Sequence, residues 1–181
     1  MFSKRRVSAE DTLLLAIVRA KEWQRAQTPQ IQTKPTQRNP IIPPRHPPTW
    51  RCHTDAAWKD KSTAGLGWIF TDQFQTVLRQ GSYPVDKVCS PLMAEALATL
   101  TAMEVAIESG FHHTSFASDS QVLVKAINRK IFPKELHGIL FDILSLSLKF
   151  TSISFLFVSR SQNQLADALA KSALLISCIV P

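Results

Sequence analysis

Cysteine, charge and long apolar runs are all scarce in this chain of 181 residues. Its three cysteines are widely spaced and form no disulfide framework or metal knuckle, so we expect an intracellular setting, nucleus or cytoplasm. The charged fraction is 19%, and no apolar run approaches the ~18 residues of a membrane span, so no membrane partner is expected. Acidic residues at 10 and 11 interrupt the basic start, so we also expect no secretory signal.

Positive charge is concentrated in the first 50 residues. They hold nine basic and three acidic residues, a balance of +6, whereas residues 51–181 hold twelve basic and eleven acidic residues, a balance of +1. A basic arm on a nearly neutral body suits a polyanion such as nucleic acid, and a solvated tail that binds nothing specific is an equally good interpretation.

Proline separates this arm from a folded domain. Residues 8–27 have the spacing of a helix, and residues 28–49 contain seven prolines, which helix interiors and central strands exclude. Hydrophobic residues make up 45% of the chain, enough for one packed core. We therefore expect a largely disordered basic helix and proline-rich linker at 1–49, a domain at 50–175 and an apolar tail at 176–181.

Short strand and helix patterns alternate along the domain and predict a mixed α/β sheet. Three strands come first, as an antiparallel meander. A helix then begins with Ser90 as its cap and Pro91 as its first residue, and Gly110 ends it. The expected strands span 51–58, 64–71, 76–85, 113–118 and 152–159, the last of them largely buried; further helices span 120–129 and 135–148, and a capping box at 161–164 opens the last helix.

Four carboxylates stand among small residues in this pattern. Asp55 and Asp119 are expected at the ends of the first and fourth strands, and Glu95 and Asp167 in the first and last helices. Such positions can converge at one rim of a sheet, where ligand sites of α/β proteins lie. Clustered carboxylates repel one another unless a cation joins them, and two Mg²⁺ ions ~3.5–4 Å apart hold the attacking and leaving oxygens of a phosphodiester.

Each acid also has an ordinary interpretation. Asp167 and Lys171 are spaced as a surface ion pair, which is the better interpretation of Asp167 taken alone. Glu95 can complement a helix dipole, Asp119 can cap a helix, and Asp55 can be a turn residue. All four acids in this order of elements favour a shared site.

Two other side chains stand near these acids in the sequence. His53 shares a strand face with Asp55, but burial in the core is the better interpretation for it. Arg160 follows the fifth strand, where binding a phosphate and lying in solvent are equally good interpretations.

Five motifs occur in order, at 50–58, 65–68, 90–98, 118–120 and 163–171. Together they resemble the ribonuclease H-like domains of plant non-LTR retroelements and their domesticated relatives. The resemblance implies a ribonuclease H-like fold, a five-stranded mixed sheet with the first three strands antiparallel, flanked by helices. It also implies an endonuclease that hydrolyses the RNA strand of RNA–DNA hybrids with two Mg²⁺ or Mn²⁺ ions, and it places Asp55, Glu95, Asp119 and Asp167 as the catalytic and metal-binding acids. The resemblance covers about residues 50–175.

The sequence departs from this family at two places. Well-characterised ribonucleases H usually have a histidine at the position of Phe157, and bacterial types carry a basic protrusion where only residues 129–134 stand here. A histidine can transfer protons or assist product release, so we expect weak cleavage and weak hybrid binding by a monomer. The alternatives are a nucleic-acid-binding module with impaired catalysis and a silent retroelement fragment.

Overall fold

The computed structural model of the chain describes residues 50–59 and 63–177. The expected N-terminal helix and linker, and the end of the apolar tail, lie outside these residues. Among the described residues, no helix has the length and apolar character needed to cross a bilayer. The strands are β1 (Trp50–Lys59), β2 (Thr63–Thr71), β3 (Val77–Asp86), β4 (His113–Ser118) and β5 (Ser152–Phe157), and the helices are α2 (Pro91–Glu108), α3 (Gln121–Arg129), α4 (His137–Ser147) and α5 (Gln164–Ser177), with short 3-10 helices η1 (Lys134–Leu136) and η2 (Arg160–Gln162).

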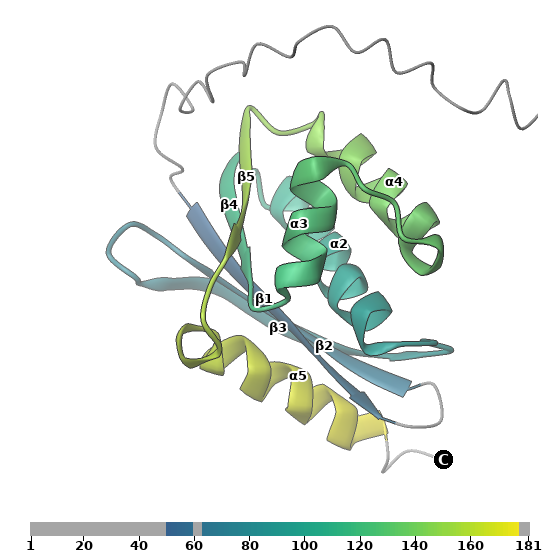
Figure 1. Cartoon of the computed structure of the whole chain (residues 1–181). Coiled ribbons are helices and arrows are strands. Elements are labelled where there is room, and N and C mark those ends of the chain that lie inside the picture. Colours follow the sequence, from purple (N-terminus) through teal and green to yellow (C-terminus); the bar gives the residue numbers. More distant parts are fainter. Residues whose placement is uncertain (1–49, 60–62, 178–181) are drawn as a thin grey trace, which may run out of the picture. The chain divides into compact units, whose positions relative to one another are not determined.

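The strands form one mixed sheet in the order β3-β2-β1-β4-β5 (Figure 1). β1 pairs antiparallel with β2, and β2 with β3, whereas the β1–β4 and β4–β5 pairs are parallel. This confirms the expected five-stranded mixed sheet with its first three strands antiparallel. Parallel pairing brings the C-terminal ends of β1 and β4 toward the same edge of the sheet.

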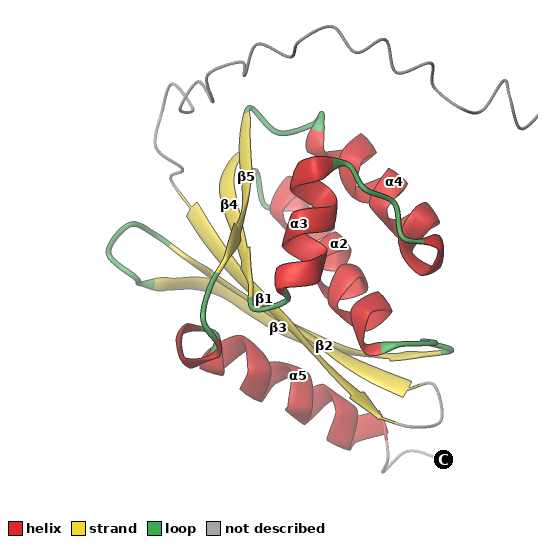
Figure 2. Ribbon diagram, in the orientation of Figure 1, coloured by secondary structure: helices red, strands yellow, loops and turns green. Residues whose placement is uncertain are grey.

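Helices cover both faces of the sheet. Figure 2 shows α2, α3 and α4 on one side and α5 alone on the other. α5 lies very close to β2 at Gly65 and Gly67. A Cβ atom added at Gly65 would collide with the backbone of Ala170 in α5, and one added at Gly67 would collide with the backbone of Ala166. Only glycine permits this approach, which fixes where α5 begins on the sheet.

The local signals around α2 are confirmed. The Ser90 hydroxyl accepts a hydrogen bond from the Met93 backbone N–H at 3.1 Å, Pro91 is the first helical residue, and Gly110 has φ of +73° beyond the last turn. The buried face of α2 consists largely of alanines, which let the helix lie close to the sheet; they are Ala94, Ala96, Ala98, Ala102 and Ala106.

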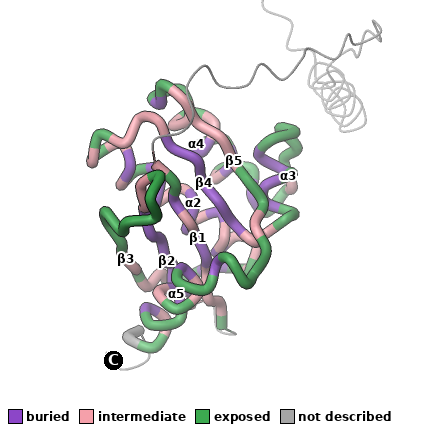
Figure 3. The backbone as a smooth tube through the Cα atoms, turned by 90° about the vertical axis from the view of Figure 1, so that its left-hand side faces the viewer, coloured by how far each residue is buried: buried purple, intermediate pink, exposed green. Residues whose placement is uncertain are grey.

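Three local predictions are wrong. The capping box lies at Ser159 and Gln162 and opens η2, whereas we expected it at 161–164. The spacing of apolar residues in 120–129 predicts Val122 on the buried face of α3, but Val122 is exposed and Val124 is buried in its place. β5 is not largely buried, because it lies at an edge of the sheet (Figure 3), where a strand has a partner on one side only.

Candidate metal centre

We expected Asp55 near the end of a first strand over 51–58, and β1 continues past Asp55 to Lys59 beside β2. Its pairing with β4 stops earlier, at the His53 and Ala117 partners, so Asp55 lies just beyond the last β4 contact. The Asp55 side chain is 4% exposed, and its Oδ1 accepts a hydrogen bond from the Ala56 backbone N–H at 2.8 Å. Asp55 is therefore a buried strand residue and not a turn residue.

Glu95 and Asp119 reach the same place from α2 and from the residue after β4. One carboxylate oxygen from each of Asp55, Glu95 and Asp119 lies within 4.8 Å of the others. Asp119 does not cap α3, because the Ser120 hydroxyl accepts the hydrogen bond from the Leu123 backbone N–H. The predicted convergence of these three acids is confirmed, and we call the three the acidic triad.

Burial and mutual repulsion change the protonation of the triad. Burial, followed by the charge of Asp119, raises the pKa of Asp55 to about 6. Burial, followed by the charges of Asp55 and Asp119, raises the pKa of Glu95 to about 9. Without a cation, Glu95 is therefore protonated at neutral pH.

Two oxygens of the triad are buried without a partner. Asp55 Oδ2 and Glu95 Oε2 have no hydrogen-bond donor among the described residues. Leaving a buried acceptor unsatisfied costs roughly 1–3 kcal/mol. Carboxylate oxygens are the ligands that Mg²⁺ and Mn²⁺ prefer, so these residues fit a divalent cation.

Asp167, the fourth predicted acid, lies at the edge of the triad in the first turn of α5. Its Oδ2 is 2.6 Å from Lys171 Nζ, so the predicted ion pair exists. Asp167 is also close enough to Asp55 for its charge to raise the pKa of Asp55, although it is outside the group of three. The ion pair and proximity to the triad are thus both properties of Asp167.

Asn163 is a site residue that the sequence patterns did not identify as one. It is 1% exposed and precedes α5, and its amide Nδ2 donates to the Thr54 carbonyl oxygen at 2.9 Å. The same nitrogen lies 3.5 Å from Asp119 Oδ1. An asparagine one helical turn before Asp167 was the available signal, but a place in the expected capping box explained it equally well.

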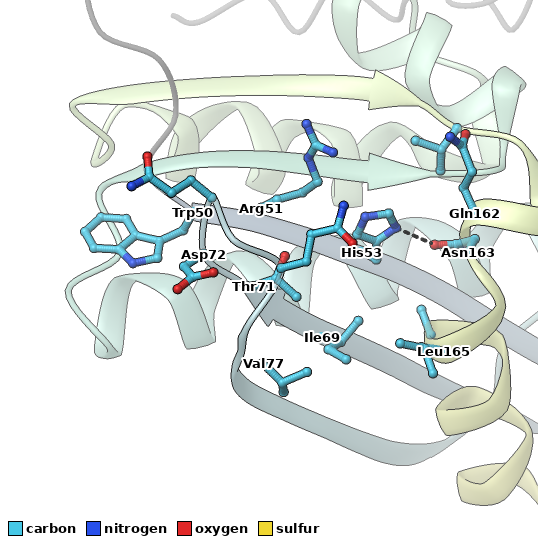
Figure 4. A pocket seen from close by; sticks show the side chains of 14 residues that line it. Trp50, Arg51, His53, Ile69, Thr71, Asp72, Val77, Gln162, Asn163 and Leu165 are labelled. Carbon is cyan, nitrogen blue, oxygen red and sulfur yellow. Dashed lines mark hydrogen bonds between the residues drawn. The ribbon is translucent and has the colours of Figure 1, made fainter.

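His53 is half-buried and is not a core residue. Its Nδ1 lies 3.3 Å from Asn163 Oδ1, and both residues line a cavity of about 560 Å³ between the sheet and the start of α5 (Figure 4). Burial lowers the pKa of His53, and the hydrogen bond with Asn163 offsets part of that effect.

Arg160 and Phe157 stand at the outer rim of the triad. Arg160 Nε is 3.9 Å from Asp119 Oδ2, while 82% of the Arg160 side chain is exposed. Phe157 is 50% exposed and pairs with Ser118, the residue before Asp119. An exposed cation therefore lies beside Asp119, and an exposed phenylalanine lies on the neighbouring strand.

Comparison with known families identifies the domain. The sequence profile of the family described as reverse transcriptase-like matches residues 53–173. The chain belongs to this reverse transcriptase-like family. No curated protein matches it.

Solved structures similar to this family member share its fold. Ribonuclease H1 of the halophilic archaeon Halobacterium salinarum is 25% identical with a TM-score of 0.66, over 70% of this chain and 98% of that one. The N-terminal ribonuclease H domain of a Mycobacterium tuberculosis protein is 20% identical with a TM-score of 0.66, over 71% of this chain and 95% of that one. LC11 ribonuclease H1 in complex with an RNA/DNA hybrid is 19% identical with a TM-score of 0.65, over 71% of this chain and 99% of that one. The domain has the ribonuclease H fold.

Proposed function

We propose that this protein is a metal-dependent endonuclease that hydrolyses the RNA strand of RNA–DNA hybrids. The observation that carries the proposal is the acidic triad on a ribonuclease H fold, with carboxylate oxygens within 4.8 Å of one another and two buried oxygens unpartnered. Two of the similar solved structures, LC11 ribonuclease H1 and a foamy viral protease-reverse transcriptase, were determined with an RNA/DNA hybrid. That supports a hybrid as the substrate class.

Asp55, Glu95 and Asp119 would hold two Mg²⁺ or Mn²⁺ ions, with Asp167 at the edge of the site. Such ions generate the nucleophile and stabilise the leaving oxygen of a phosphodiester. The chain contributes the rest. Burial holds Asp55 and Glu95 in place, and the exposed Arg160 guanidinium beside Asp119 is free to bind a phosphate of the strand.

The turnover we expect is weak because Phe157 has no group that transfers protons. A positioned acid or base contributes roughly 10²–10⁴-fold in related reactions, so its loss slows metal-assisted hydrolysis without abolishing it. The same residue favours a second candidate, a nucleic-acid-binding module that has kept the fold. For the protein itself, we propose an origin in a plant non-LTR retroelement, a location in the nucleus or cytoplasm, and a monomeric state, as expected from the sequence.

The test is cleavage of a hybrid by the full chain and by Asp119→Asn, which keeps the shape of the side chain and removes its charge. Asp142→Asn is the matched control, because Asp142 is an exposed acid of α4 away from the triad. We expect cleavage by the wild type and by Asp142→Asn, and none by Asp119→Asn. Equal cleavage by all three proteins would exclude the triad as the catalytic site. Hybrid binding without cleavage by the wild type would favour the second candidate, a nucleic-acid-binding module.

A further inference from the structure

The amide group of Asn163 connects His53 with the acidic triad. Asn163 Nδ2 faces the Thr54 carbonyl oxygen at 2.9 Å and Asp119 Oδ1 at 3.5 Å, and Asn163 Oδ1 faces His53 Nδ1 at 3.3 Å. Figure 4 shows the imidazole and the amide pointing toward each other, at the corner of the cavity where α5 begins. Every polar atom of the Asn163 side chain therefore has a partner.

These partners allow the amide only one orientation. Both neighbours of Nδ2 are acceptors, so a rotated amide would place its oxygen against a carbonyl oxygen and a carboxylate. With Oδ1 on the other side, His53 must donate through Nδ1–H, whether the ring is neutral or protonated. The His53 imidazole and the Thr54 carbonyl both favour this orientation from outside the triad, and of the two only the imidazole can be changed by a side-chain substitution.

The backbone of Asn163 is bonded to the fourth acid, Asp167. Its carbonyl oxygen accepts a hydrogen bond from the Asp167 backbone N–H at 3.0 Å, which closes the first turn of α5. Its side-chain bond to Thr54 holds β1 at the residue before Asp55. A change in the Asn163 side chain therefore affects the segments that carry two acids of the triad, Asp55 and Asp119.

We propose that His53 is a positioning residue of the metal centre, which acts by fixing the Asn163 amide so that its N–H group orients Asp119. This inference rests on the proposed function. Partners of metal ligands beyond the direct ligands set ligand orientation in metalloproteins, and their loss costs 10–100-fold in affinity or activity. His53 lines an open cavity of about 560 Å³, so a phenyl ring fits in its place without repacking the core.

The first experiment uses the full chain with His53→Phe, which removes the donor, and His53→Asn, whose Nδ2 stands as far from the backbone as Nδ1 of histidine. We expect His53→Phe to lower kcat for hybrid cleavage and affinity for Mn²⁺ by about 10-fold, with KM unchanged, and His53→Asn to restore most of both. His113→Phe, at the opposite end of β4 from Asp119, is the matched control and should leave both unchanged. Melting curves confirm that each variant is folded.

Two further measurements separate this mechanism from general loss of structure. In the Asn163→Ala background, His53→Phe should have no additional effect, because a residue that acts through another is non-additive with it. In the metal-free protein, ¹⁵N NMR should show the His53 proton on Nδ1, and Asn163→Ala should remove that preference.

The outcomes distinguish the two proposals. Wild-type kcat and Mn²⁺ affinity in a folded His53→Phe would overturn the positioning role and leave the nuclease intact. Fully additive effects of His53→Phe and Asn163→Ala, or a His53 proton on Nε2, would also overturn it. A wild type that neither binds Mn²⁺ nor cleaves hybrid would overturn the proposed function, and the role of His53 with it.

Discussion

One carboxylate oxygen of Asp55 and one of Glu95 lie within 4.8 Å of each other, and each residue also keeps one buried oxygen without a partner among the described residues. They come from β1 and α2, which the packing of the alanine face of α2 on the sheet brings together. Two carboxyl groups buried this close together lower the stability of the metal-free protein, and they are suitable ligands for a cation.

The free energy of unfolding of the metal-free protein should fall as the pH rises. Both raised pKa values mean that the folded state binds more protons than the unfolded state between pH 4 and the folded pKa values of about 6 for Asp55 and about 9 for Glu95. The raised pKa of Asp55 corresponds to a loss of roughly 3 kcal/mol in the free energy of unfolding once the pH is above about 6. Asp55→Asn should therefore raise the melting temperature in EDTA at pH 8 by several degrees.

Asp142→Asn is the control for this measurement, since Asp142 is exposed and outside the triad. Mg²⁺ or Mn²⁺ should stabilise the wild type at pH 8 and not Asp55→Asn. A melting temperature of the metal-free protein that rises from pH 5 to pH 8 would contradict the assignment of a repulsive buried pair.

Phe157→His should increase cleavage of the hybrid. Phe157 is half exposed at the end of β5, beside the residue that precedes Asp119, so an imidazole there is not forced into the core. We expect kcat to rise by a factor no larger than the roughly 10²–10⁴ of general acid–base catalysis. Single-turnover cleavage of a labelled hybrid measures it, and Leu156→His, the exposed neighbour whose side chain points to the other face of the sheet, is the control. An unchanged rate in a folded Phe157→His would count against a missing proton-transfer group as the cause of weak turnover.

Arg160→Ala should weaken hybrid binding without affecting stability. The guanidinium is 82% exposed, so its removal changes the free energy of unfolding by no more than about 0.5 kcal/mol. Without this cation beside a phosphate of the strand, KM should rise and the slope of log affinity against log salt should fall by about one. Lys149→Ala, an exposed cation in the segment before β5, is the control. The same KM and slope in both variants would mean that Arg160 lies in solvent in the complex.

The basic residues of the first 50 positions should add salt-dependent affinity for nucleic acid. This part of the sequence carries +6 of the total +7. Replacing its nine basic residues with glutamine should make the salt slope less steep, by up to about 0.9 for each phosphate that these residues neutralise. Fluorescence anisotropy with a labelled hybrid in EDTA measures the slope without cleavage, and an unchanged slope would show that these residues do not bind the strand.

Local signals predicted most of the fold. Ser90, Pro91 and Gly110 each specify one end of α2 through a backbone requirement that holds in any surroundings. The convergence of the triad also followed from the sequence, because the order of strands and helices implies which strand ends share an edge. Two overlapping segments, however, both had the pattern of a capping box, and only the path of the chain after β5 selects Ser159.

The parts that could not be predicted depend on contacts between distant residues. His53 and Asn163 are 110 positions apart, and nothing local to either residue indicates their hydrogen bond. The exposure of Leu156 and Phe157 follows from the edge position of β5, which alternation of apolar and polar residues does not reveal. The unpartnered oxygens of Asp55 and Glu95 likewise follow from packing and not from sequence pattern.

The most direct test of the account is a gel assay of the full chain on one RNA–DNA hybrid, labelled on the RNA strand and then on the DNA strand. The reaction is run in EDTA, in Mg²⁺ and in Mn²⁺. The account predicts slow cleavage of the RNA strand alone, in either metal and not in EDTA. An intact RNA strand in Mn²⁺, or equal cleavage in EDTA, would contradict it.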